Sequence, residues 1–177
     1  MLILLELGRV LAARKRPRDA TRILAEALEG AIQRDDPSAQ AAVHMAIGEM
    51  RRAEGNLVGA EASFSAALRE FAAGSADVLA LAKSAVELAS TMAQGENQEA
   101  ARDALDRAQE LAADARAPYL EARAASVLVA LSERQNDPAL AQAALRKAWE
   151  AAARAGDAEA AGNHEQALAR NPTLVSL

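Results

Sequence analysis

The sequence predicts an all-α protein, an α-solenoid in which antiparallel helical hairpins stack one after another. Three observations support this prediction. Apolar residues make up 51% of the 177 residues, yet aromatic residues make up only 2%. Apolar side chains follow helical spacing, and no segment alternates with the period of two that a half-buried strand shows. A pattern of small and large apolar residues recurs about every 40 residues, which is typical of a repeat architecture.

The composition favours closely packed helices over sheets. Alanine supplies much of the apolar share, and it has the highest helix propensity because its side chain loses no entropy on ordering. Its small size also lets neighbouring helices approach closely. Strands favour aromatic and β-branched residues, so we expect no strands in this chain.

Four copies of the repeat can be aligned. The first contains Gly8, Ala20, Leu24, Ala27 and Leu28. The second, 40 residues later, contains Gly48, Ala60, Phe64, Ala67 and Leu68. The third and fourth, 81 and 121 residues after the first, contain Ala89, Ala101, Leu105 and Ala108, and Val129, Ala141, Leu145 and Ala148. The small residues let the two helices of a hairpin come close, and the larger residue one turn later fills the space between them.

The helices can be placed from their apolar spacing and their end signals. We expect nine, over residues 2–14, 17–34, 38–53, 57–73, 76–93, 98–115, 118–134, 138–155 and 158–169. Asp36-Pro37 and Asp137-Pro138 each combine a cap residue with proline at the first helical position, where its missing N–H costs little. Turns are expected at Gly55, Gly74-Ser75, Gly95 and Ala117-Pro118.

These helices predict a single domain over residues 1–170. Its repeats span about 1–36, 37–74, 75–117 and 118–156, and a capping helix follows at 158–169. The capping segment is short, amphipathic and rich in polar residues, which suits the end of a stack because a terminal repeat needs a polar outer face. Asn171-Pro172 ends this helix, and residues 171–177 are expected to form a loose C-terminal tail.

The repeat resembles the tetratricopeptide repeat family. Gly8, Ala20, Leu24 and Ala27 match the family's sequence of small, alanine, bulky apolar and alanine positions, over about residues 1–155. The period of 40–41 residues exceeds the 34 usual for the family and looks like that of arrays in large bacterial signal-transduction regulators. The resemblance implies a right-handed superhelix whose concave face binds a partner.

The resemblance also implies which residues contact that partner, because the first helix of each hairpin lines the concave face. Carried onto this sequence, they are Arg9, Met45, Glu49, Arg52, Lys83, Ser90, Gln94, Arg123, Ser126, Glu133 and Arg134. Basic residues outnumber acidic ones in this set, although the whole chain has a net charge of -5. Field focusing in a groove then favours an acidic peptide. The alternative is that the arginines only keep the groove hydrated.

The first helix is a second candidate surface. Met1, Leu2, Ile3, Leu4 and Leu5 make its beginning apolar on every side, and exposed apolar surface of this extent usually marks an interface. One interpretation is that one side packs on the second helix while the rest stays exposed. The others are a homodimer through this helix, or a preceding repeat or domain absent from this chain.

The composition argues against several classes of function. Affinity for nucleic acid comes from Lys and Arg neutralising phosphates, and this chain is acidic. It has no cysteine, and its only histidines, His44 and His164, are far apart in the sequence, so no metal site and no cofactor is expected. No apolar run approaches the roughly 20 residues that span a bilayer. We therefore expect a cytoplasmic protein without a membrane partner.

These expectations combine into a non-catalytic scaffold module that binds a protein or peptide on its concave face, within a regulatory or assembly system. No catalytic residues are expected, because the sequence shows no set of polar groups of the kind that converge around an enzyme pocket. Two alternatives stay open. One is a ligand-responsive regulatory domain of a bacterial transcriptional or signalling regulator, and the other is an oligomerisation element that uses the first helix.

Overall fold

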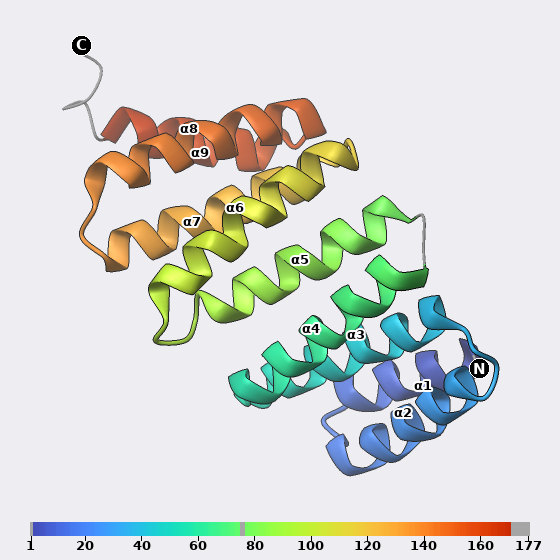
Figure 1. Ribbon diagram of the computed structural model, residues 1–177. Coiled ribbons are helices and arrows are strands. Elements are labelled where there is room, and N and C mark those ends of the chain that lie inside the picture. The colour runs from blue at the N-terminus through green and yellow to red at the C-terminus, as the bar shows by residue number, and fades with distance from the viewer. Residues whose placement is uncertain (1, 75–76, 171–177) are drawn as a thin grey trace.

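The computed structural model describes residues 2–74 and 77–170, and these residues form a stack of α-helices without a strand (Figure 1). The helices are α1 (Leu2–Ala13), α2 (Pro17–Ile32), α3 (Pro37–Ala53), α4 (Leu57–Gly74), α5 (Val78–Met92), α6 (Gln98–Asp114), α7 (Pro118–Arg134), α8 (Pro138–Ala155) and α9 (Ala158–Arg170). The prediction of an all-α helical repeat solenoid is confirmed.

The observed helix ends lie close to those expected from the sequence, and α7 and α8 have the predicted bounds. The largest difference among the described residues is two residues, at the end of α2. Three predictions concern residues outside the described part of the chain. They are the helix start at residue 76, the turn residue Ser75 and the C-terminal tail at 171–177.

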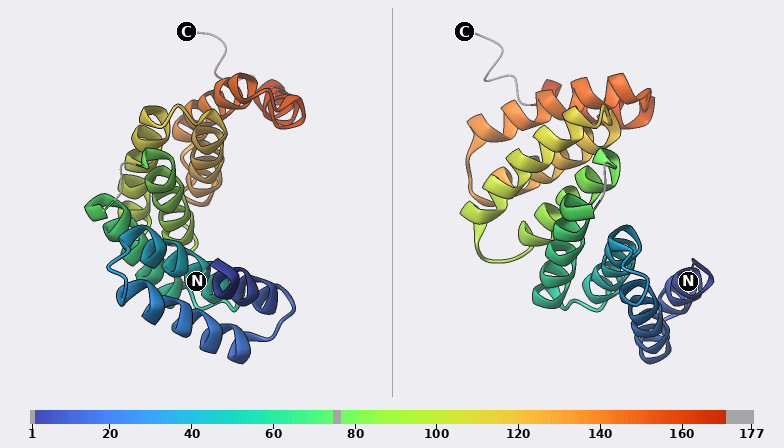
Figure 2. Two further views of the ribbon diagram at one scale, coloured as in Figure 1. Left: turned by 90° about the vertical axis from the view of Figure 1, so that its right-hand side faces the viewer. Right: turned by 45° about the vertical axis from the view of Figure 1, so that its right-hand side comes forward.

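The helices pack as hairpins, α1 with α2, α3 with α4, α5 with α6 and α7 with α8, and α9 packs on α8. The second helix of each hairpin also packs on the first helix of the next one. The stack is curved, and in the left-hand view of Figure 2 its blue N-terminal and red C-terminal ends lie on the same side of the bend. The first helices α1, α3, α5 and α7 lie along the inside of this bend and form its inner face (Figure 2), and α1 contacts α3 as α5 contacts α7. No helix in the described residues is both long and apolar enough to cross a bilayer.

The buried apolar residues of the described chain form three clusters, and each crosses a boundary between hairpins. One joins α1 and α2 to α3, where Val43 and Met50 belong to it. The second is centred on Phe64 of α4 and includes side chains at the start of α5. The third extends over α5, α6, α7 and α8. Each hairpin therefore completes its core with its neighbours, as expected for a repeat protein.

The first two hairpins need glycine where the helices approach most closely. A Cβ atom on Gly8 would lie 2.6 Å from Leu24 Cδ2, and a Cβ atom on Gly48 would lie 2.6 Å from Phe64 Cε1. Leu24 and Phe64 are fully buried, so neither side chain has free space into which to move. The predicted pairing of a small residue with a large one is confirmed in both hairpins.

Six connections within the described residues share one turn geometry. In each, one residue has a positive φ, and the N–H of the next residue bonds to the carbonyl oxygen five residues earlier, which closes the helix end. The positive-φ residues are Lys15, Asp35, Gly55, Arg116, Asn136 and Gly156. Asp36 and Asp137 cap the following helices as predicted, because each accepts a hydrogen bond from the N–H three residues further on, at 2.9 Å and 3.0 Å.

Candidate functional site on the inner face

The predicted partner-binding residues are distributed over all four helices of the inner face. The structure separates them into three groups. Some line a cleft between α1 and α3, and some belong to polar contacts centred on α5. The remaining ones are buried in the core or lie next to α9.

A cleft of about 700 Å³ opens between α1 and α3. Much of its lining is apolar and consists of Ala12, Ala13, Ala46, Met50 and Ala53. Charged residues of both signs also line it, namely Arg9, Lys15, Glu49 and Glu54. A concave, mainly apolar surface with a few charged groups has the character of a binding cleft. Two of the predicted residues, Arg9 and Glu49, therefore lie together at this cleft.

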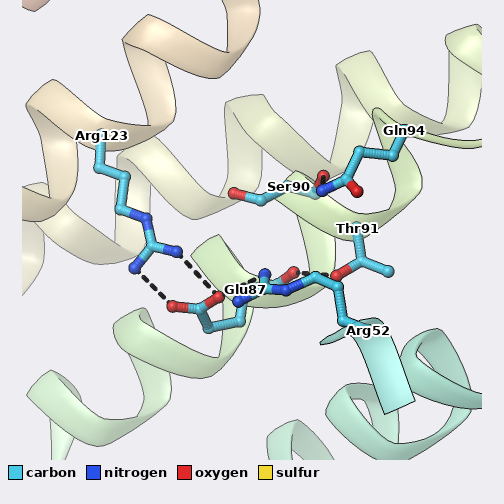
Figure 3. Close-up of polar contacts among 6 residues, drawn as sticks. All are labelled: Arg52, Glu87, Ser90, Thr91, Gln94 and Arg123. Carbon is cyan, nitrogen blue, oxygen red and sulfur yellow. Dashed lines mark hydrogen bonds and ion pairs between the residues drawn. The ribbon is translucent and has the colours of Figure 1, made fainter. Parts of the chain in front are cut away.

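Arg52, Glu87 and Arg123 form an ion-pair cluster that joins three successive hairpins (Figure 3). Glu87 on α5 is only 3% exposed. Arg52 Nη1, from α3, lies 2.6 Å from Glu87 Oε2. Arg123, from α7, pairs in a bidentate manner, with Nη1 2.5 Å from Oε1 and Nη2 2.9 Å from Oε2. Two arginines thus share one buried carboxylate.

The two arginines compensate the burial of that charge. A carboxylate removed from water without a partner costs several kcal/mol, and fork-shaped contacts with guanidinium groups are the strongest hydrogen bonds available to offset this cost. Arg52 also lies over the ring of Phe64, with Cζ 5.4 Å from the ring centroid, a cation–π geometry. Because the cluster has two cations and one anion, it leaves this part of the inner face positively charged.

Glu87 was not among the residues predicted for the site, although the sequence contains a signal for it. Three of the buried polar residues of α5 are Ser84, Glu87 and Thr91. The corresponding residues of α3 are Val43, Ala46 and Met50. The two hydroxyl groups donate hydrogen bonds to carbonyl oxygens of their own helix, at 2.6 Å and 2.8 Å, so the carboxylate alone reaches other helices. A glutamate at a position where the neighbouring repeats have Ala46 and Val127 marks this site.

The other predicted cations have different environments. Arg9 pairs with Glu6 on its own helix at 3.2 Å. Arg134 Nη1 donates a hydrogen bond to Ala93 O at the end of α5, at 2.5 Å, and so satisfies a carbonyl at a helix terminus. Lys83 is exposed and forms no ion pair or hydrogen bond with the residues that the structure describes. Among the predicted cations, Lys83 therefore carries a positive charge that no described residue neutralises.

Three residues of the predicted contact surfaces are buried within this chain. Met45 and Ser90 are 5% and 6% exposed, because their positions turn toward packed helices rather than toward the groove. Leu5, predicted as part of an interface, is 6% exposed and belongs to the core of the first hairpin. Leu4 is half-buried against the same core. Met1 lies outside the described residues.

The last helix limits the accessible inner face at α7. Ser126 Oγ lies 3.4 Å from His164 Nε2 of α9. Glu133 lines a cleft of about 310 Å³ together with Leu168 of α9. Gln94, in the turn after α5, is exposed, and its side-chain amide donates a hydrogen bond to the carbonyl oxygen of Ser90 on α5. The accessible surface therefore runs from the α1–α3 cleft to Arg123.

The surroundings of His44, on α3, shift its pKa. Burial lowers the pKa of His44 below its ordinary value of 6.5, because desolvation disfavours the imidazolium form. Glu70 acts in the opposite direction, whereas Arg69 and Arg51 add to the lowering. No group of three or more His, Asp or Glu side chains within the described residues has the arrangement to hold a metal ion.

No protein-family model and no curated protein matches this chain. Indications of its function therefore come from the cleft between α1 and α3 and from the ion-pair cluster around Glu87.

Proposed function

We propose that this chain is a non-catalytic scaffold of tetratricopeptide type, which acts in the cytoplasm in a regulatory or assembly system and binds a protein segment along its inner face. The observation that carries the proposal is the α1–α3 cleft of about 700 Å³, with its alanine-rich lining and its charged residues of both signs. Apolar anchors surrounded by polar contacts are the usual composition of a protein–protein interface.

The cleft favours a partner segment with one or two large apolar side chains. Ala12, Ala46 and Ala53 line it, and each contributes only a Cβ atom, so the space between α1 and α3 is free for side chains of the partner. An amphipathic helix or an extended peptide delivers such anchors at regular spacing. The segment would then continue along the inner face toward α5.

Acidic residues next to the apolar anchors would match the charge of the inner face. Lys83 is exposed and the Glu87 cluster carries one excess positive charge, so carboxylates of the partner are attracted toward α5. Arg52 and Arg123 are poor choices for a charge-reversal test, because both hold Glu87. Lys83→Glu reverses a charge without disturbing a described contact.

The test is to select binders from a displayed library of random peptides on the 177-residue chain and to titrate them by fluorescence anisotropy. Ala53→Trp places an indole in the cleft, and we expect affinity to fall at least about tenfold, or roughly 1.4 kcal/mol. Ala113→Trp, at an exposed site near the end of α6, is the matched control and should leave affinity unchanged. Lys83→Glu should weaken acidic peptides by about threefold and neutral ones not at all.

Selected peptides that bind Ala53→Trp as tightly as the unmodified chain would contradict the placement of the site. A library that yields no specific binder would contradict the scaffold function itself. The cleft volume also lies within the range of small-molecule sites, which favours the ligand-responsive regulatory domain as the second candidate. Stabilisation of the chain by a small metabolite in a thermal-shift screen, abolished by Ala53→Trp, would support that candidate instead.

A further inference from the structure

One side of α1 is an apolar surface exposed to solvent. Ile3, Leu7 and Val10 are spaced by four and three residues, so they lie on one face of the helix. Their exposed fractions are 82%, 42% and 46%, and the neighbouring Leu2 is 73% exposed. We refer to these four residues as the α1 stripe. Its opposite side, which includes Leu5, packs into the core of the first hairpin.

The repeat shows what the α1 stripe corresponds to in the other hairpins. Ile3 and Val10 correspond to Val43 and Met50 of α3, which are 0% and 6% exposed. In α5 and α7 the corresponding residues are also buried, namely Ser84, Thr91, Ala124 and Leu131. The second helix of the preceding hairpin packs on each of these first helices. Ile3 and Val10 of the α1 stripe therefore occupy positions that are buried under a packed helix in the other three hairpins.

Of the surfaces on this chain, the one that matches the α1 stripe best is the α1 stripe of a second copy. The other large apolar residues exposed in the described part of the chain are Ile32, Val58, Val78, Leu79, Tyr119 and Trp149. None of these combines with another at the three- or four-residue spacing of a helical face. The helix at the opposite end of the stack, α9, contributes no residue to this set. Head-to-tail pairing of α1 with α9 would therefore leave the α1 stripe without an apolar counterpart.

We propose that two copies of this chain associate through their α1 stripes, related by a two-fold axis and with the two helices antiparallel. In this arrangement Ile3 of each copy packs against Val10 of the other, and the two Leu7 side chains meet at the axis. A two-fold interface buries the same patch on both copies and closes after two subunits.

Charge selects the antiparallel orientation. Exposed basic residues follow the stripe at the C-terminal end of α1, namely Arg14, Lys15, Arg16 and Arg18. Antiparallel helices place the two basic groups at opposite ends of the contact, roughly 18 Å apart for a helix of this length. Parallel helices would bring them together, and like charges at short distance repel.

The size of the α1 stripe predicts a weak dimer. A standard interface buries about 1,600 Å², and a contact made by one helix of each copy is smaller, so we expect a dissociation constant on the order of 10 μM. A membrane surface matches the stripe less well. Helices that lie on a membrane have Lys and Arg along their polar face, whereas the charged residues of α1 are Glu6 and Arg9, which pair with each other.

Sedimentation equilibrium of the 177-residue chain tests the proposal. The measurements cover concentrations from about 1 to 200 μM, a range that includes the expected dissociation constant. The unmodified chain should change from monomer to dimer over this range. Ile3→Glu combined with Val10→Glu should remain monomeric, with an unchanged circular dichroism spectrum because both side chains are largely exposed. Val58→Glu, at a residue of α4 that is 80% exposed, is the matched control and should dimerise normally. A chain that is monomeric at every concentration would overturn the proposal.

Cysteine cross-linking tests the orientation, because the chain has no cysteine of its own. Leu7→Cys should form a disulfide-linked dimer on mild oxidation, and a mixture of Ile3→Cys with Val10→Cys should form the mixed dimer. Ile3→Cys alone should not, because the two sites would be more than about 10 Å apart along the helices and a disulfide needs Cα atoms within about 7 Å. Efficient cross-linking of Ile3→Cys alone, or of Val58→Cys, would overturn the antiparallel pairing. Binding of a monomeric chain to phosphatidylcholine–phosphatidylglycerol vesicles would overturn the proposal in favour of a lipid surface.

Discussion

The boundary between the first and second hairpins differs in chemistry from the boundary between the second and third. At the first boundary, α3 contributes Val43 and Met50 to a cluster of apolar side chains from α1 and α2. At the second boundary, α5 has the buried polar residues Ser84 and Thr91 at the corresponding positions, and Glu87 between them pairs with arginines of α3 and α7. One repeat geometry is thus stabilised in two different ways.

The two kinds of boundary have different physical consequences. Apolar burial has no preferred direction, so it stabilises a contact without specifying one orientation. A bidentate ion pair has a defined geometry and loses most of its value when a partner moves. The backbones of the first helices approach closely at α1–α3 and at α5–α7, whereas Arg52 extends from α3 to reach Glu87 on α5. We infer that the Glu87 cluster sets the angle between the second and third hairpins.

Removal of Glu87 should have the largest effect on stability. Glu87→Ala leaves two arginines without their shared carboxylate, and we expect the free energy of unfolding to fall by about 3 kcal/mol in urea denaturation. Glu6→Ala, at the corresponding position of α1, removes an exposed ion pair with Arg9 and should cost less than about 0.5 kcal/mol. Equal losses in the two variants would mean that the cluster does not stabilise the boundary.

The apolar boundary should respond to the loss of Met50. Met50→Ala leaves a cavity between the first two hairpins, and we expect a loss of about 2 kcal/mol in the same assay. Val10→Ala changes the corresponding residue of α1, which is 46% exposed, and should change stability by less than about 0.5 kcal/mol at protein concentrations where the chain is monomeric. A comparable loss in Val10→Ala would show that its side chain is packed in solution.

Glycine substitutions compare a crowded contact inside a hairpin with an uncrowded position on α9. Gly48→Ala places a methyl group 2.6 Å from the buried ring of Phe64, and we expect a net loss of about 1–2 kcal/mol despite the better helix propensity of alanine. Gly162→Ala on α9 meets nothing within 4 Å and should stabilise the chain by about 0.5–1 kcal/mol. Calorimetry should show melting temperatures that move in opposite directions, and a rise in both would contradict the close helix approach in the second hairpin.

The smallest effect should be the pH dependence that comes from His44. Burial lowers the pKa of His44 in the folded chain below the ordinary value of 6.5, so the unfolded chain takes up a proton first as the pH falls. Stability contributed by neutral His44 is therefore present above pH 6.5 and decreases as the pH falls from 6.5 through the lower folded pKa. Urea midpoints measured from pH 7.5 to 5.5 should decline less in His44→Gln. Identical declines in both chains would exclude His44 as the group responsible.

Local sequence patterns were sufficient to predict the helices and their pairing. Helix propensity, apolar spacing, Asp-Pro caps and glycine turns depend on residues within a few positions of one another, so they can be recognised without a structure. The match of Gly8 with Leu24 and of Gly48 with Phe64 also follows from the repeat, because each pair lies within one hairpin and recurs at fixed spacing. The observed helix bounds agree with these expectations.

Only the tertiary structure showed which side chains reach solvent and which reach each other. Arg52, Glu87 and Arg123 come from three hairpins, and their meeting depends on the angle between the hairpins, which no local pattern encodes. The same holds for Met45 and Ser90, whose burial depends on the rotation of each helix about its own axis. Interactions between residues close in the sequence thus determined the helices. Burial and charge pairing between distant segments decided which surface is available for binding.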